Sequence, residues 1–167
     1  MKEMMSFTTE RLSAETLDRT ISGTHSEIIA MFTEQVSRYL PPSCQQLHTP
    51  EAVNNWLNTM EETGTVLRLV DQQHVDQQQH GIGFIFVFPE PDNCYRVGYV
   101  LDEAYWGKGL ATEVMRGLVA YLSNQKQAAS FIAGVEPQNQ GSVNVLVKLG
   151  FHLDYSEQGV DYYKLLT

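Results

Sequence analysis

Cysteine is scarce in this chain of 167 residues: Cys44 and Cys94 are the only two, and neither belongs to a CxxC or Cys/His pair. A disulfide framework or a structural zinc site therefore has no support. The chain also lacks a run of 18 apolar residues, and residues 1–13 lack the apolar stretch of a signal peptide. These absences predict a cytoplasmic protein with no membrane-spanning segment.

Basic residues are also few, since 11 lysines and arginines face 20 acidic residues and leave a net charge of −9. Such a balance repels the phosphates of nucleic acids and the head groups of anionic lipids. We expect no nucleic-acid partner and no membrane partner. With 43% hydrophobic residues, a chain of this length can bury a substantial core, so we expect a single domain over residues 1–167.

Aromatic and β-branched residues predict a short first strand over residues 7–12. A Thr-x-x-Glu capping box at residues 24–27 begins an apolar helical period that predicts one helix over residues 24–40. Two prolines end that helix. A threonine followed by proline begins the helix predicted over residues 50–63, and a glycine ends it.

The remainder of the chain predicts strands and helices in alternation. Strands are expected over residues 65–70, 81–88, 95–101, 130–135, 151–155 and 160–166, and helices over 107–124 and 139–149. The β-α-β alternation of the second half requires parallel pairing, and the last strand closes the sheet in the antiparallel sense. The predicted fold is α/β, with a mixed central sheet and helices on both faces.

Residues 71–80 form a polar, glutamine-rich stretch between two predicted strands. His74, Asp76 and His80 are metal-ligand types within it. Flexible loops place ligands poorly, and the composition is more typical of a solvated hairpin loop. We therefore expect no metal site.

The most informative segment runs from Tyr105 to Thr112, where Gly107 and Gly109 lie between a predicted strand and an amphipathic helix. Glycine lets the backbone approach a ligand closely. The free N–H groups at the start of the helix and its positive dipole end suit a phosphate or pyrophosphate. Lys108 adds a positive charge, so the turn predicts an anion site.

Known nucleotide loops fit this turn poorly. The spacing of a nucleoside-triphosphate loop is absent, and Thr112 stands at the third glycine position of a dinucleotide fingerprint. A nucleotide-phosphate binder and a tight turn without ligand both remain open on the turn alone.

Four motifs in order add context to the turn: Glu10-Arg11-Leu12, Val97-Gly98-Tyr99-Val100-Leu101, the glycine turn followed by Glu113, and Asn139-Gln140-Gly141-Ser142 running into Lys148-Leu149-Gly150-Phe151. Together they resemble the GNAT acetyltransferase superfamily, and within it the Rim-type branch of ribosomal-protein N-terminal acetyltransferases. Ala104 departs from the superfamily's glutamine or arginine at that position.

The resemblance implies a mostly antiparallel sheet with one splayed parallel strand pair, and acetyl-coenzyme A as a cosubstrate in the wedge between strands 95–101 and 130–135. It implies no metal. Backbone groups of Val100 and Leu101 are expected to pair with the pantetheine arm, and Gly98 suits a bulge that opens the gap. The expected cofactor-binding residues of the turn are Trp106, Gly107, Lys108, Gly109, Leu110, Ala111 and Thr112, of which Lys108 to Thr112 are expected to receive the pyrophosphate.

Further site residues follow from the last motif. The resemblance implies that Asn139 contacts the pantetheine arm and that Ser142 lies near the sulfur, where its hydroxyl can stabilise or protonate the leaving thiolate. Glu136, at the end of strand 130–135, is the expected carboxylate for base or amine-binding work. Tyr99 and Glu103 are weaker candidates.

The function implied is an N-acetyltransferase that transfers an acetyl group to a primary amine, by direct attack in a ternary complex. The acceptor is a protein N-terminus or a small amine, in a pocket that Tyr155, Tyr162 and Tyr163 could shape. A homodimer is compatible with this expectation. The alternative is a non-catalytic GNAT-fold module that binds or senses acyl-coenzyme A, which would not need a hydroxyl beside the sulfur.

Overall fold

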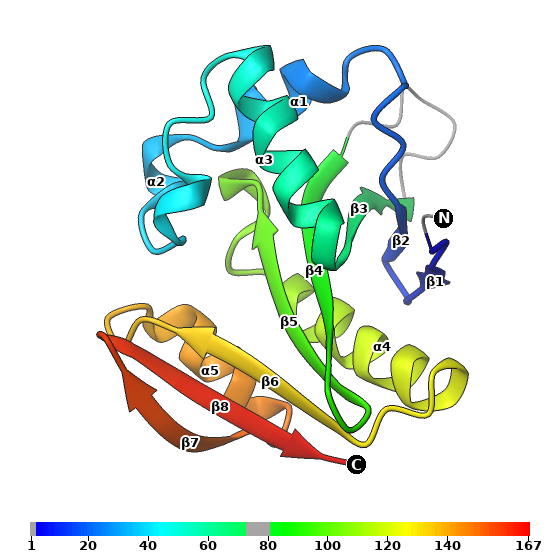
Figure 1. The fold of residues 1–167 in the computed structure, drawn as a ribbon, viewed down its shortest axis with the longest axis vertical. Helices are drawn as coiled ribbons and strands as arrows, with labels where there is room; N and C mark the ends of the chain where they lie inside the picture. Colours follow the sequence, from blue (N-terminus) through cyan, green and yellow to red (C-terminus); the bar gives the residue numbers. More distant parts are fainter. Residues whose placement is uncertain (1–2, 73–80) are drawn as a thin grey trace.

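The computed structural model describes residues 3–72 and 81–167. Their strands form one eight-stranded sheet in the order β1-β2-β3-β4-β5-β6-β8-β7 (Figure 1). The strands are β1 (Ser6–Thr8), β2 (Leu12–Thr16), β3 (Thr65–Asp71), β4 (Gly81–Glu90), β5 (Cys94–Leu101), β6 (Ser130–Val135), β7 (His152–Glu157) and β8 (Val160–Leu166). The α-helices are α1 (Thr24–Met31), α2 (Glu34–Ser37), α3 (Pro50–Thr63), α4 (Leu110–Gln125) and α5 (Gln140–Lys148), and 3-10 turns occur at η1 (Pro42–Cys44) and η3 (Glu103–Tyr105).

Helices cover both faces of the sheet, as predicted. The helices α1, α2 and α3 lie on one face, and α4 and α5 lie on the other (Figure 1). Each face has its own apolar cluster, and β4 supplies both of them. Ile85 and Val87 join the cluster of α4 and α5, whereas alternate phenylalanines at 84, 86 and 88 join the other cluster. This two-sided burial explains why residues 81–88 read as a nearly continuous apolar run.

The first predicted strand was wrong in its bounds. Residues 7–12 form a hairpin rather than one strand, because Thr9 N donates to the carbonyl oxygen of Leu12 at 2.8 Å and turns the chain between β1 and β2. Residues Glu10 and Arg11 therefore lie in the turn. The stronger alternation follows the turn, where Leu12, Ala14 and Thr16 are buried.

The helix predicted over residues 24–40 is broken into α1 and α2. Thr33 ends the continuity, because its side chain accepts a hydrogen bond from Val36 N and caps a new helix. The predicted capping box is also wrong: Gly23 is the N-cap, with φ 93°, and the Glu27 carboxylate instead binds Arg68, whose Nε lies 2.9 Å from Oε2. The apolar period continued across the break because both helices face the same core.

The predicted ends of α3 are confirmed. Thr49 accepts a hydrogen bond from Ala52 N at 3.1 Å, Pro50 occupies the first turn, and Gly64 is the C-cap. Trp56 on the buried face of α3 packs edge-to-face on Phe32, with 5.3 Å between ring centroids. The capping residues alone thus predicted where α3 begins and ends.

The parallel pair is short and splayed. Register between β5 and β6 runs only from the pair Cys94 and Ser130 to the pair Arg96 and Ile132. Beyond it, β5 continues with β4 to Leu101, and β6 continues with β8. The gap predicted at the carboxyl ends of these strands is therefore present.

Two details of the sheet differ from expectation. The register between β4 and β5 is continuous past Gly98, so no bulge occurs there and the gap comes from divergence of the strands. The alternation of the second half also predicted that β7 would pair in parallel, but β8 lies between β6 and β7. The antiparallel sense predicted for the last strand is confirmed, since β8 pairs antiparallel with both. A hairpin from β7 into β8 makes this order possible without a long crossover.

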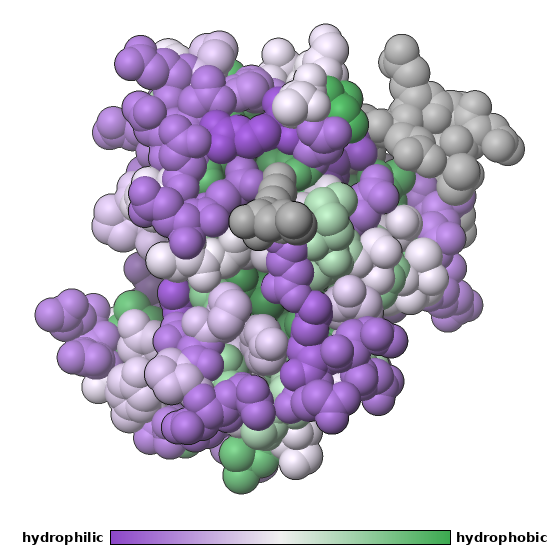
Figure 2. Space-filling model, turned by 45° about the vertical axis from the view of Figure 1, so that its right-hand side comes forward, coloured by the Kyte–Doolittle hydropathy of each residue, from purple (hydrophilic) through white to green (hydrophobic). Residues whose placement is uncertain are grey.

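The surface matches the composition. Figure 2 shows a face on which hydrophilic side chains predominate and apolar side chains appear in smaller areas. Within residues 3–72 and 81–167, no helix has both the length and the apolar character needed to cross a bilayer.

Close packing between β4 and β5 gives a first prediction. A Cβ at Gly83 would collide with the carbonyl oxygen of Val100 and lie 2.8 Å from Cδ2 of Leu101, whereas a Cβ at Gly98 would first meet the Phe86 ring at 3.8 Å. We expect Gly83→Ala to lower the free energy of unfolding by about 1–3 kcal/mol. Gly98→Ala should change it by less than about 1 kcal/mol. Urea denaturation of both variants measures this, and equal losses would contradict the packing.

Candidate functional site

A cavity of about 640 Å³ lies where β5 and β6 part. The end of β5, the glycine turn, the first turn of α4, one face of α5 and the segment around α2 line it. The predicted site residues that line it are Val100, Leu101, Trp106, Gly107, Gly109, Leu110, Ala111, Thr112, Asn139 and Ser142. The structure thus brings the glycine turn and the Asn139 motif to one cavity.

The backbone of the glycine turn adopts conformations that favour glycine. Gly107 and Gly109 have φ values of 72° and 76°, in the left-handed region. Gly109 is the N-cap of α4, so the helix begins at Leu110 rather than at the predicted Gly107. The first backbone hydrogen bond of the helix runs from Glu113 N to Gly109 O at 3.1 Å. The N–H groups of the three preceding residues therefore have no partner within the helix and can bind an anion.

The backbone edge of β5 faces the gap at every second residue. Asp102 N donates to Ile82 O at 2.8 Å, and with the continuous register this places the polar backbone groups of Val100 toward β4. By the same alternation, those of Tyr99 and Leu101 face the gap. The carbonyl oxygen of Leu101 already accepts a hydrogen bond from Trp106 Nε1 at 2.9 Å.

A pair of hydroxyl groups lies in the cavity lining. Tyr99 Oη and Ser142 Oγ are 2.9 Å apart and hydrogen-bonded. Asn139 caps α5, because its Oδ1 accepts a hydrogen bond from Ser142 N at 3.3 Å. Burial raises the pKa of the Tyr99 phenol above its ordinary value, although the hydrogen bond with Ser142 opposes the shift. The phenol therefore stays protonated near neutral pH and can donate a proton or a hydrogen bond.

The structure does not bring the predicted carboxylate to the cavity. Glu136 follows β6, and its carbonyl oxygen accepts a hydrogen bond from Asn139 N at 2.9 Å, but the residue is not among those that line the cavity. Glu103, in η3, does not line it either. Across the described part of the chain, no aspartate or glutamate lines this cavity.

The three late tyrosines also lie outside the lining. Tyr155 on β7 stacks on Tyr162 of β8, with 4.7 Å between ring centroids. Tyr163 packs against the apolar cluster of α4 and α5. Packing against neighbouring strands and the apolar cluster, rather than contact with the cavity, accounts for the positions of these three rings.

Two cations line the cavity, although the chain is strongly acidic. Among the described residues, ion pairs engage other cations, at Arg11, Arg19, Arg68, Arg96 and Lys126. Arg38 and Lys148 line the cavity and make no ion pair in that part of the chain. The side chain of Lys108 lies over the Tyr105 ring, 5.6 Å from its centroid, and is not in the lining. The cavity therefore favours anions.

Sequence reasoning missed the cavity residues of α2 and of the α5 face. Gln35, Arg38 and Tyr39 reach the lining because the break before α2 turns the chain toward β5. Lys148 was noted only as part of a motif. Its spacing of seven from Gly141, with Asn144 and Val145 between, is a helical stripe that could have identified this face.

Metal-ligating residues do not gather at the cavity or elsewhere in the described ranges, where no three His, Cys, Asp or Glu side chains form a candidate site. The residues considered as ligands, His74, Asp76 and His80, lie outside the described residues.

Comparisons with known sequences agree with this geometry. The family model of the acetyltransferase (GNAT) domain matches residues 17–152. The probable N-acetyltransferase YjcK of Bacillus subtilis is 46% identical over 56 residues, which are 34% of this chain and 31% of that protein. The uncharacterized protein YkkB of the same organism is 32% identical over 63 residues, 38% of this chain and 37% of that protein. The matched stretches thus span about a third of these relatives.

Comparisons with solved structures cover nearly the whole chain. A GNAT-family acetyltransferase from Bacillus anthracis has a TM-score of 0.80 at 19% identity, covering 97% of this chain and 98% of that one. The ribosomal-protein-S5-alanine acetyltransferase of Vibrio fischeri has a TM-score of 0.69 at 19% identity, with coverage of 97% and 96%. RimL in complex with coenzyme A has a TM-score of 0.75 at 17% identity, with 98% of both chains covered. With its splayed strand pair, its glycine turn and a family model that spans most of its length, this chain belongs to the GNAT acetyltransferase family.

Proposed function

We propose that this protein transfers the acetyl group of acetyl-coenzyme A to a primary amine. The observation that carries the proposal is one anion-favouring cavity that joins the free N–H groups of the α4 turn to the hydroxyl pair of Tyr99 and Ser142. The solved structure of RimL, which shares the fold, is a complex with coenzyme A. A long ligand with phosphates at one end and a thioester at the other suits both ends of such a cavity.

The residues present fit the phosphate end of this ligand. The pyrophosphate would accept hydrogen bonds from the backbone N–H groups of Leu110, Ala111 and Thr112, with the positive end of α4 behind them. Gly107 and Gly109 leave room for close approach. Lys148, seven residues along α5 from Gly141, adds a positive charge for a phosphate.

The pantetheine arm fits the free edge of β5. The backbone groups of Tyr99 and the N–H of Leu101 face the gap and would pair with its amides in the manner of an added strand, whereas the carbonyl oxygen of Leu101 already accepts from Trp106 Nε1. The Val100 groups bond toward β4, so the side chain of Val100, rather than its backbone, belongs to the cavity wall. Asn139 lines the same cavity at the start of α5.

The chemistry assigned to the site is a direct transfer. The acceptor first loses one ammonium proton to solvent, since the described lining holds no carboxylate, and the neutral amine nitrogen then forms a bond to the thioester carbonyl carbon. The nitrogen loses its second proton to solvent as the carbon–sulfur bond breaks. Ser142 donates a hydrogen bond to the departing thiolate, and Tyr99 supplies the proton along the hydroxyl pair before it is reprotonated from solvent. A protein N-terminus and a small primary amine both satisfy this scheme.

Cofactor binding is tested by titration calorimetry with acetyl-coenzyme A. We expect micromolar binding by the wild type and a loss of at least about 30-fold in Gly109→Asp, which adds a side chain and a negative charge at the anion site. Gly159→Asp is the matched control, because Gly159 also has a left-handed φ, of 81°, but lies in the turn between β7 and β8. No binding by folded wild type would refute the assignment.

The hydroxyl pair predicts a separation of turnover from affinity. Ser142→Ala should lower kcat by about 10- to 100-fold and Tyr99→Phe by about threefold to tenfold, while the Kd for acetyl-coenzyme A changes by less than about twofold. Ser156→Ala, an exposed serine on β7, serves as the control. Full acetylation rates in both site variants would contradict the role assigned to the hydroxyl pair. A wild type that binds the cofactor but acetylates no amine would instead favour the non-catalytic module.

The absence of a carboxylate from the described lining predicts the pH dependence. Because the pKa of Tyr99 is raised, its phenol does not titrate between about pH 7 and 9.5. The rise of kcat/KM with pH should therefore follow the ammonium pKa of the acceptor, and it should move between two accepted amines of different basicity. A limb that stays in place for both amines and disappears in Glu136→Gln would instead identify Glu136 as the base.

A further inference from the structure

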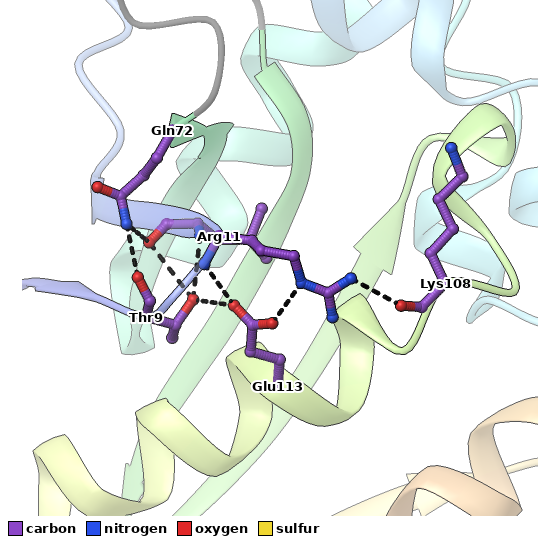
Figure 3. Close-up of polar contacts among 6 residues, drawn as sticks. Thr9, Arg11, Gln72, Lys108 and Glu113 are labelled. Carbon is purple, nitrogen blue, oxygen red and sulfur yellow. Dashed lines mark hydrogen bonds and ion pairs between the residues drawn. The ribbon is translucent and has the colours of Figure 1, made fainter.

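The turn between β1 and β2 contributes an arginine that reaches the glycine turn from outside the cavity (Figure 3). Arg11 Nη1 donates to the carbonyl oxygen of Lys108 at 3.0 Å, and its Nε donates to Glu113 Oε1 at 2.7 Å. Arg11 is not among the residues that line the cavity. One guanidinium thus connects the glycine turn to the first turn of α4.

The contact with Lys108 acts on the backbone of the turn. The Lys108 carbonyl lies between two left-handed glycines, which by themselves leave the intervening peptide planes free to rotate. In a planar trans peptide, the carbonyl of Lys108 and the N–H of Gly109 point in opposite directions. A carbonyl held toward Arg11 therefore directs the Gly109 N–H away from Arg11. The ammonium of Lys108 also points away from the guanidinium (Figure 3).

The contact with Glu113 acts on charge. Glu113 lies in the first turn of α4, where an unpaired carboxylate would repel an anion bound at the same helix end. Although burial favours its neutral form, hydrogen bonds from Thr9 and Arg11 and the charge of Arg11 lower the pKa of this carboxyl. Glu113 is therefore ionised at neutral pH, and Arg11 is the cation that compensates it.

The turn that carries Arg11 is itself held in place (Figure 3). Gln72 Nε2 donates to the carbonyl oxygens of Thr9 and Leu12, at 2.6 and 3.0 Å, and Gln72 N donates to Arg11 O at 2.8 Å. Thr9 Oγ1 and Arg11 N both donate to Glu113 Oε2, at 2.5 and 2.8 Å. The guanidinium is thus set by three segments that lie far apart in the sequence.

We propose that Arg11 is a positioning residue that sets the affinity of the glycine turn for the pyrophosphate of coenzyme A, by fixing the Lys108 carbonyl and neutralising Glu113. The proposal rests on the proposed function. Arg11 touches neither the cofactor cavity nor the hydroxyl pair, so its effect falls on cofactor affinity and leaves the chemical step unchanged.

The test compares Arg11→Met with Arg19→Met by titration with coenzyme A and by kinetics at saturating acceptor. Arg19 is a matched control because it also ties distant segments together, through Asn58 Oδ1 at 2.8 Å and Asn54 Oδ1 at 3.0 Å, but it lies away from the cavity. We expect Arg11→Met to raise the Kd for coenzyme A and the KM for acetyl-coenzyme A about tenfold, with kcat within twofold. Arg19→Met should change none of these.

A second variant separates positioning from a purely structural role. Glu113→Gln leaves Arg11 on the Lys108 carbonyl and removes the negative charge, so we expect lower thermal stability but coenzyme A affinity about two- to fivefold tighter. Weaker binding in Glu113→Gln, or an unchanged Kd in Arg11→Met, would overturn the proposal even if Arg11→Met folds poorly. Failure of the wild type to bind coenzyme A would refute the proposed function instead.

Discussion

The divergence of two parallel strands after a short stretch of pairing is the constraint on which the site depends. Each strand keeps its outer partner, β4 for β5 and β8 for β6, so the sheet remains intact on both sides of the gap. Inside the gap, the edge of β5 presents the backbone groups of alternate residues, of which the carbonyl oxygen of Leu101 already accepts a hydrogen bond from Trp106 Nε1. Buried backbone groups need partners, and a ligand with amide groups can supply them. The order of strands in the sheet therefore favours the wedge as the place for a ligand.

Charge distribution gives the wedge its preference for anions. The chain carries a net charge of −9, yet the described lining contains Arg38 and Lys148 and no carboxylate. Most other described cations sit in ion pairs away from the cavity, and Arg11 neutralises the one glutamate close to the helix start. A surface that repels polyanions in general can thus bind a small phosphate ligand at one place.

The hydroxyl pair shows how separate sequence signals become one chemical unit. Tyr99 comes from the parted end of β5 and Ser142 from the first turn of α5, and they are 43 residues apart in the chain. Burial keeps the phenol protonated, which suits proton donation to a leaving group and opposes a role as base. Glu136, which the sequence favoured for proton removal, follows β6 but does not reach the cavity.

The sequence by itself determined the features that local backbone chemistry encodes. Thr49 and Gly64 mark the ends of α3, the left-handed glycines mark the turn before α4, and the motif at Asn139 marks the start of α5. Each depends on a few consecutive residues, because caps, turns and helical periods are local. The resemblance carried by these motifs also predicted the splayed pair and the cofactor wedge.

Only the tertiary structure decided how these features meet. The apolar pattern of the sequence did not reveal the helix break at Thr33, because α1 and α2 pack against the same core. The position of β8 between β6 and β7 depends on the order of the strands in the sheet rather than on the residues of any one strand. Arg11 meets Glu113 across 102 residues of sequence. Such contacts follow from the order of the strands and from the packing of helices on both faces of the sheet. A local pattern of residue types predicts neither of these.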